Sequence, residues 1–221
     1  MLNLPEFTCA QDVCDCVEKI GFLPLFSNVV PGFSVEEHID RSKYYFVDGI
    51  EGIWEWKEQI AAEHRVPYGK YLFGNCAFIS REWFPALANY RRDGYDFDSR
   101  IDEGVISHNA AKIYRLIEEN GAMLTGDLRK ASGITEGFDG LIAKLQAQTY
   151  LAVREFCYKR TKDGRPYGWG IAKLDFTERI FGELPRAAYS EEPAESYTRM
   201  QEHLRKLLPG IDEKTLRKML K

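Results

Sequence analysis

The sequence predicts an α+β fold on three observations. Apolar residues repeat at helical spacing in three short segments between residues 109 and 145, two strand-like runs follow them, and a Gly-Asn pair at position 74 separates two further apolar runs. Periodicity of this kind indicates amphipathic helices, and apolar runs around a glycine-containing turn indicate a hairpin. Three short helices before a two-stranded hairpin is the element order of a winged helix-turn-helix domain. We therefore expect such a domain at 106–182, preceded by a small aromatic-rich α+β unit at 1–105 and followed by a charged helical tail at 183–221.

Capping residues, apolar spacing and prolines predict the elements of the N-terminal unit. Pro67 should end a helix, because the residue before a proline avoids the helical conformation. Gly74 accepts the positive φ of a tight turn, so the runs on either side of it should pair as strands. The expected helices lie at 9–20, 35–40, 53–64 and 81–92, and the expected hairpin at 68–79.

Helix and strand signals continue through the predicted winged domain and the tail. Thr125 caps a second short helix that Gly133 ends, and a turn at Asp163-Gly164 joins two strand-like runs. In the tail, Pro193 should start a helix. The expected elements are helices at 109–120, 125–132 and about 138–145, strands at 149–160 and 167–174, and tail helices at 193–207 and about 211–220.

Composition excludes several classes of protein. No apolar run approaches the roughly 20 residues that span a bilayer, and the N-terminus lacks a basic segment followed by an apolar core. We therefore expect a cytoplasmic protein without membrane contact. Five cysteines and four scattered histidines lack the paired spacing of a metal site, so we expect reduced thiols, no metal and no cofactor.

Charge is distributed unevenly along the chain. The net charge is −4, but residues 109–182 carry 12 Lys and Arg against 9 Asp and Glu, a balance of +3. The rest of the chain has 18 basic and 25 acidic residues, a balance of −7. The predicted winged domain is therefore the positive part of an acidic protein, which favours local phosphate binding that salt weakens.

Basic residues of the predicted domain are the candidate nucleic-acid contacts. The third helix supplies one, and the others lie on or around the wing, where they would meet phosphates. The third helix has few side chains that read base edges, so we expect backbone binding to double-stranded DNA rather than sequence recognition. The alternative is a charged turn that is simply solvated. The candidates are Lys144, Arg154, Lys159, Arg160, Lys162 and Arg165.

A second cluster mixes aromatic and basic residues. Aromatic rings beside cations can stack on a base and hold a phosphate. The alternative is that Trp56 packs in the core, Trp54 covers it, and Lys57 is solvated. The members of this candidate pocket are Trp54, Trp56, Lys57, Arg65, Tyr68 and Lys70.

The segment Trp54-Glu55-Trp56-Lys57, with Tyr68-Gly69-Lys70 downstream and a winged-helix pattern after it, resembles AlkZ-related proteins over about residues 21–181. These are distant relatives of the YcaQ/AlkZ family of winged-helix DNA glycosylases. The resemblance implies DNA repair, and the wider family excises alkylated or crosslinked bases. Its catalytic signature is Gln, an apolar residue, then Gln or Asp, near the N-terminus of a longer chain.

Gln146-Ala147-Gln148 has that pattern at the end of the third helix instead. Gln146 and Gln148 are therefore weak catalytic candidates, and the family's role is not carried over to them. A glutamine can orient a water molecule but cannot act as a base.

Three functions stay open on the sequence. The first is DNA binding through the wing with little or no catalysis, and the second is a DNA glycosylase that acts on alkylated bases. The third is a protein-interaction module, in which the acidic remainder of the chain and the amphipathic tail bind a partner or a second copy. A tail that docks on its own chain is the simpler alternative.

Overall fold

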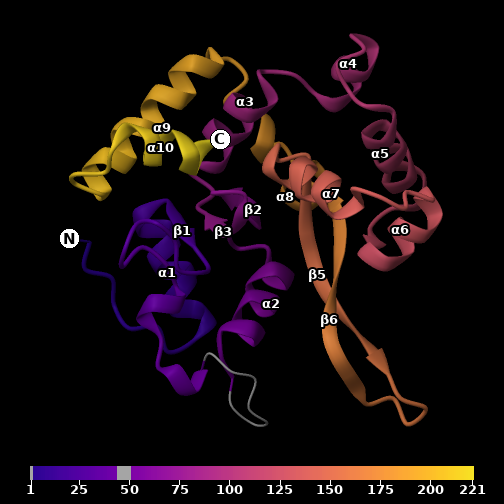
Figure 1. Ribbon diagram of the computed structural model, residues 1–221, viewed down its shortest axis with the longest axis horizontal. Helices are drawn as coiled ribbons and strands as arrows, with labels where there is room; N and C mark the ends of the chain where they lie inside the picture. The colour runs from indigo at the N-terminus through magenta and orange to yellow at the C-terminus, as the bar shows by residue number, and fades with distance from the viewer. Residues whose placement is uncertain (1, 44–50) are drawn as a thin grey trace.

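The computed structural model describes residues 2–43 and 51–221 as a mixed α+β fold (Figure 1). Within these residues two small antiparallel sheets form. The N-terminal sheet has the order β1–β3–β2, from β1 (Phe22–Pro24), β2 (Tyr68–Leu72) and β3 (Asn75–Ile79). The second sheet has the order β4–β6–β5, from β4 (Met123–Leu124), β5 (Leu151–Arg160) and β6 (Pro166–Phe176).

The helices of the N-terminal part are α1 (Ala10–Ile20), α2 (Ile53–Glu63), α3 (Phe84–Arg92) and α4 (Phe97–Asp102). The first three and the β2–β3 hairpin confirm the sequence expectations. The helix expected at 35–40 is shorter, a single 3-10 turn at Glu36–His38, with another turn at Arg41–Lys43. Helix α4 was not expected, because its six residues are too few to show a periodicity.

An acidic side chain caps the start of α1. The N-cap is Cys9, and the carboxylate of Asp12 accepts hydrogen bonds from the backbone amides of Cys9 at 3.3 Å and Thr8 at 2.8 Å. An acidic side chain in the first turn satisfies amides that have no partner within the helix. Before the 3-10 turn at Glu36–His38, the Ser34 hydroxyl accepts from the Glu37 backbone amide at 3.3 Å and donates to the Glu37 carboxylate at 2.6 Å.

The middle of the chain contains α5 (His108–Asn120), α6 (Thr125–Ser132) and α7 (Phe138–Ala147), followed by the β5–β6 hairpin. All three helices and both long strands confirm the sequence expectations. The short strand β4 was not expected; its two residues pair with β6 at Leu174 and Lys173. Figure 1 shows that the far half of the hairpin extends away from the helices.

The tail folds back on its own chain. It contains α8 (Thr177–Phe181), the turn η3 (Leu184–Arg186), α9 (Pro193–Leu207) and α10 (Glu213–Leu220). The apolar residues Leu204, Leu216 and Met219 are fully buried, and the His203 ring stacks on Trp83 at 4.4 Å. The tail therefore docks on its own chain, which was the simpler alternative, because its apolar face is covered by the chain's own residues.

One hydrophobic core runs through all three parts of the chain. Helix α7 packs against β2, α2 against β5, and α3 against α9. The boundaries expected near residues 105 and 182 stay predictions, and the core continues across both positions.

Two adjacent arginines on α3 connect these parts. Arg92 is fully buried, and its guanidinium donates to the Thr149 carbonyl at 2.7 Å, to the Thr177 hydroxyl at 2.8 Å and to the Glu178 carboxylate. It also donates to the Tyr189 hydroxyl at 3.1 Å. A buried cation is tolerated only when its donors are satisfied in this way.

Arg91 completes the connection from the same helix. Its guanidinium donates to the carbonyls of Tyr71 at 2.5 Å, Ala147 at 2.6 Å and Leu220 at 3.1 Å. These carbonyls belong to β2, to the last residue of α7 and to the last residue of α10. The pair therefore fixes the N-terminal sheet, the middle helices and the tail relative to one another.

We predict that Arg92→Ala lowers the free energy of unfolding by about 3–5 kcal/mol, because it leaves Glu178 and the polar atoms of Thr149 and Thr177 without their partner. Arg92→Lys should lose less, since it keeps the charge but reaches fewer acceptors. Urea denaturation measures both. The exposed Arg115→Ala is the control and should change stability by less than about 0.5 kcal/mol. An Arg92→Ala variant as stable as this control would show that the buried cation is dispensable.

Candidate nucleic-acid interface

The far end of the β5–β6 hairpin, residues 158–169, is called the hairpin tip below. Four basic side chains on it are exposed, and among the described residues none of them forms an ion pair. The Arg160 guanidinium donates to the Gly164 carbonyl at 2.8 Å, and the Thr161 hydroxyl accepts from the Arg165 amide at 3.1 Å, which closes the turn. The four are Lys159, Arg160, Lys162 and Arg165.

Three aromatic side chains share the hairpin tip with these cations. Tyr158 is 36% exposed, Tyr167 is 50% exposed and Trp169 is 72% exposed. Tyr167 lies opposite Lys159 in the strand pairing. Side chains directly opposite each other in an antiparallel pair lie on the same face of the sheet, so these two residues share a face.

Helix α2 braces the hairpin at the start of its tip and below it. The Glu58 carboxylate accepts from the Tyr158 hydroxyl at 2.6 Å and from the Lys57 ammonium at 3.3 Å. The His64 ring bonds to the Arg154 carbonyl at 2.8 Å. At Gly170 a side chain would place its Cβ 2.5 Å from the Glu58 carboxylate, so the absence of a side chain lets the strand lie close to α2.

The residues of the predicted aromatic-basic pocket separate into several environments. Trp56 is 2% exposed in the core, and Trp54 is half-buried, with its ring 5.7 Å from Phe26 and 6.0 Å from Trp169. Trp56 therefore packs in the core, as the alternative interpretation of this cluster expected. Lys70 on β2 is half-buried.

Two other members of that group are engaged with neighbours. The Arg65 guanidinium bonds to Asp15 and Glu18 on α1, each at 2.6 Å. Tyr68 is buried, its ring 5.1 Å from Phe78 and 6.2 Å from Phe156. Burial raises the pKa of the Tyr68 hydroxyl well above its usual value.

Lys57 is buried rather than solvated. Its ammonium lies 3.8 Å from the centre of the Phe156 ring and 5.5 Å from that of Trp54. Burial lowers the pKa of Lys57 from its usual 10.5, and the nearby Glu58 carboxylate opposes that shift. Phe156, Trp54 and Glu58 therefore hold this cation between α2 and the hairpin.

Two of the predicted basic contacts lie away from the tip. Arg154 forms an ion pair with the buried Asp175 at 3.0 Å. Lys144 is exposed on α7 and lines a hollow of about 240 Å³ with Arg100, Ser107 and Gln148.

The two candidate catalytic glutamines have different surroundings. Gln146 is 7% exposed, whereas Gln148 is half-buried and lines the hollow beside Lys144. They lie two residues apart at the end of α7, and side chains at that spacing point to different sides of a helix.

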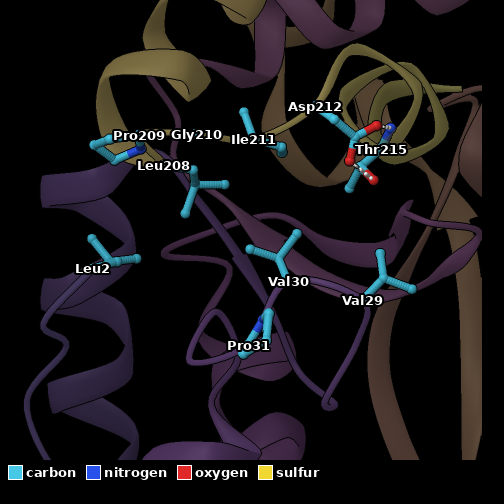
Figure 2. Close-up of a pocket in the computed structure, with 10 residues that line it drawn as sticks. All are labelled: Leu2, Val29, Val30, Pro31, Leu208, Pro209, Gly210, Ile211, Asp212 and Thr215. Carbon is cyan, nitrogen blue, oxygen red and sulfur yellow. Dashed lines mark hydrogen bonds between the residues drawn. The ribbon is translucent and has the colours of Figure 1, made fainter.

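The hollow in Figure 2 has a different chemistry from the hairpin tip. It lies between Leu2 and the loop at residues 29–31 on one side and the loop before α10 on the other, and it has a volume of about 250 Å³. Apolar side chains such as Val30, Pro31 and Ile211 line it, and its polar groups Asp212 and Thr215 bond to each other. A surface without cations is not suited to phosphate.

Cysteines and carboxylates were the other candidates for a site in the part of the chain that the structure describes. No group of His, Cys, Asp and Glu there could hold a metal ion. Burial raises the pKa of the Cys14 thiol to about 12 and that of Cys16 to about 11, which disfavours the reactive thiolate.

Among the described helices, none is both long and apolar enough to cross a membrane.

Comparison with known proteins identifies the family. The chain belongs to the AlkZ-related family, whose model matches residues 7–221, nearly the whole sequence. No curated protein and no solved structure matches the chain.

Sequence reasoning missed Glu58, Tyr158, Tyr167 and Trp169. The available signal was the alternation of Tyr167 and Trp169 with glycines beside a basic turn. The exposure of the three rings depends on how α2 packs against the hairpin, and no local sequence pattern shows that packing.

We predict that raising the pH stabilises the wild-type protein relative to Lys57→Met. The folded state lowers the pKa of Lys57, so above that pKa and up to 10.5 the unfolded chain binds more protons, and stability rises with pH. Denaturant unfolding at pH 7 to 10 measures the difference in unfolding free energy. The control is the exposed Lys19→Met variant, for which the difference in unfolding free energy from wild type should not change with pH. For Lys57→Met, a difference that stays constant or falls as the pH rises would contradict the lowered pKa of Lys57 in the folded state.

Proposed function

We propose that this AlkZ-related protein contains a winged helix, residues 106–182, that binds the backbone of double-stranded DNA through the hairpin tip. The order α5, α6, α7 and then a long antiparallel hairpin supports the winged helix, as does β4, which adds a third strand beside β6. In this assignment α7 is the recognition helix and the β5–β6 hairpin is the wing.

The observation that carries the proposal is the group of four cations at the hairpin tip. Exposed Lys and Arg without carboxylate partners are available to phosphates, and each phosphate neutralised releases counterions from DNA. The turn that carries these cations lies at the end of a hairpin whose far half extends away from the helices (Figure 1). Membership of the AlkZ-related family supports DNA as the ligand and a role related to DNA repair.

Helix α7 supports backbone binding more than recognition of bases. One side of it packs against β2. Its exposed residues are Asp139, Gly140 and Lys144, and the first of these pairs with Arg129 on α6. Only Lys144 remains to contact DNA from this helix. We therefore propose binding with little dependence on base sequence.

Reversing the four tip charges with Lys159→Glu, Arg160→Glu, Lys162→Glu and Arg165→Glu should abolish binding to a labelled duplex in fluorescence anisotropy. Wild-type affinity should fall with salt, with a slope of log K against log salt of about −0.9 for each phosphate bound. Neutral Gln substitutions at the same positions should flatten this slope by about 0.9 for each phosphate that the variant no longer neutralises.

The matched control is Lys19→Glu, Lys206→Glu, Lys214→Glu and Lys218→Glu, which makes the same change in net charge at exposed positions on α1, α9 and α10. It should retain most of the affinity. Equal loss in both variants would show that only net charge matters, and retained binding in the tip variant would rule out the tip as the contact. Thermal unfolding checks that both variants are folded.

A further inference from the structure

We propose that Trp169 and Tyr167 form a stacking surface for unpaired bases, so that the hairpin tip prefers DNA containing unpaired bases to fully paired duplex. This inference rests on the proposed function, because the tip cations must first hold the DNA backbone.

Exposure of these two rings is the first support. Tryptophan side chains are mostly buried in folded proteins, and the other three in this chain follow that pattern: Trp56 is buried, and Trp54 and Trp83 are half-buried. Trp169 is 72% exposed and Tyr167 is 50% exposed. Large rings presented to water on a projecting hairpin are typical of a binding surface.

The position of the rings among the cations is the second support. Tyr167 lies opposite Lys159 in the strand pairing, and Arg165 and Lys162 belong to the adjoining turn. A cation that holds a phosphate brings the attached base within reach of a neighbouring ring. Proteins that bind single strands combine these two features, a basic track and aromatic stacking platforms.

The hairpin is also held in a fixed position beside the rings. Trp54 contacts the Trp169 indole at a ring-centre distance of 6.0 Å and an interplanar angle of 69°, an edge contact. Nearby, Tyr158 is bonded to Glu58 on α2. A ring that is already positioned loses little conformational freedom when a base stacks on it.

Stacking explains the preference for unpaired bases. In a regular duplex each base is covered on both faces by its neighbours, so an aromatic ring can contact only the backbone or the groove. An unpaired base offers its face. Stacking of one base on an aromatic side chain corresponds to about 5- to 150-fold in affinity.

The test compares two labelled probes by fluorescence anisotropy at one salt concentration: a duplex, and the same duplex with a central bubble of unpaired bases. Wild type should bind the bubble at least about 5-fold more tightly. The variant Tyr167→Ala with Trp169→Ala should lose that preference and keep duplex affinity within about 2-fold, because its cations are intact. Tyr167→Phe with Trp169→Phe keeps both rings and should retain the preference.

The control is Tyr95→Ala, which removes a 41% exposed aromatic ring outside the hairpin and should behave as wild type. Equal wild-type affinity for the two probes would overturn the stacking inference and leave the proposed function standing. A bubble preference that persists in the double Ala variant would also overturn it. Failure of the wild type to bind either probe would instead refute the proposed function, and the inference with it.

Discussion

The buried guanidinium of Arg92 is the interaction on which the arrangement of this protein depends. It extends from the last residue of α3 and satisfies acceptors on Thr149, Thr177 and Glu178, where α7 ends and where β6 passes into α8. Because an unpaired cation in the core is very costly, any displacement of these segments relative to α3 is strongly disfavoured. Arg91 adds the ends of α7 and α10 to the same constraint. The base of the β5–β6 hairpin is thereby fixed relative to the N-terminal sheet.

From this fixed base the hairpin divides into a braced half and an extended half. Helix α2 holds the braced half through Lys57 and Glu58, where a buried ammonium, two aromatic rings and a tyrosine hydroxyl meet. The extended half carries exposed cations and rings at its end. The rest of the chain outside residues 109–182 has a balance of −7, so the cations of the tip belong to the positive part of an acidic chain, which favours the approach of a polyanion there. Rigidity at the base and charge at the end together make the hairpin a suitable contact for DNA.

The sequence predicts local elements well and their contacts poorly. Helix α5 could be predicted because its apolar spacing and its end at Gly121 lie within a few residues of each other. The partners of Arg92 lie 57 to 97 residues away along the chain, so no local pattern identifies them. Burial of Lys57 was missed for the same reason, since Phe156 is distant in sequence. The basic turn of the hairpin tip was found from composition, whereas the exposure of Trp169 depends on the length over which α2 covers β6.

The most direct test of the central claim is to locate the DNA on the protein. A duplex that contains 5-bromouracil at several positions is crosslinked to the wild-type protein by ultraviolet light, and the attached peptides are identified by mass spectrometry. The account predicts that crosslinks concentrate within residues 158–169. Crosslinks that concentrate on α9, α10 or the surface of α1, with none on the hairpin, would contradict it.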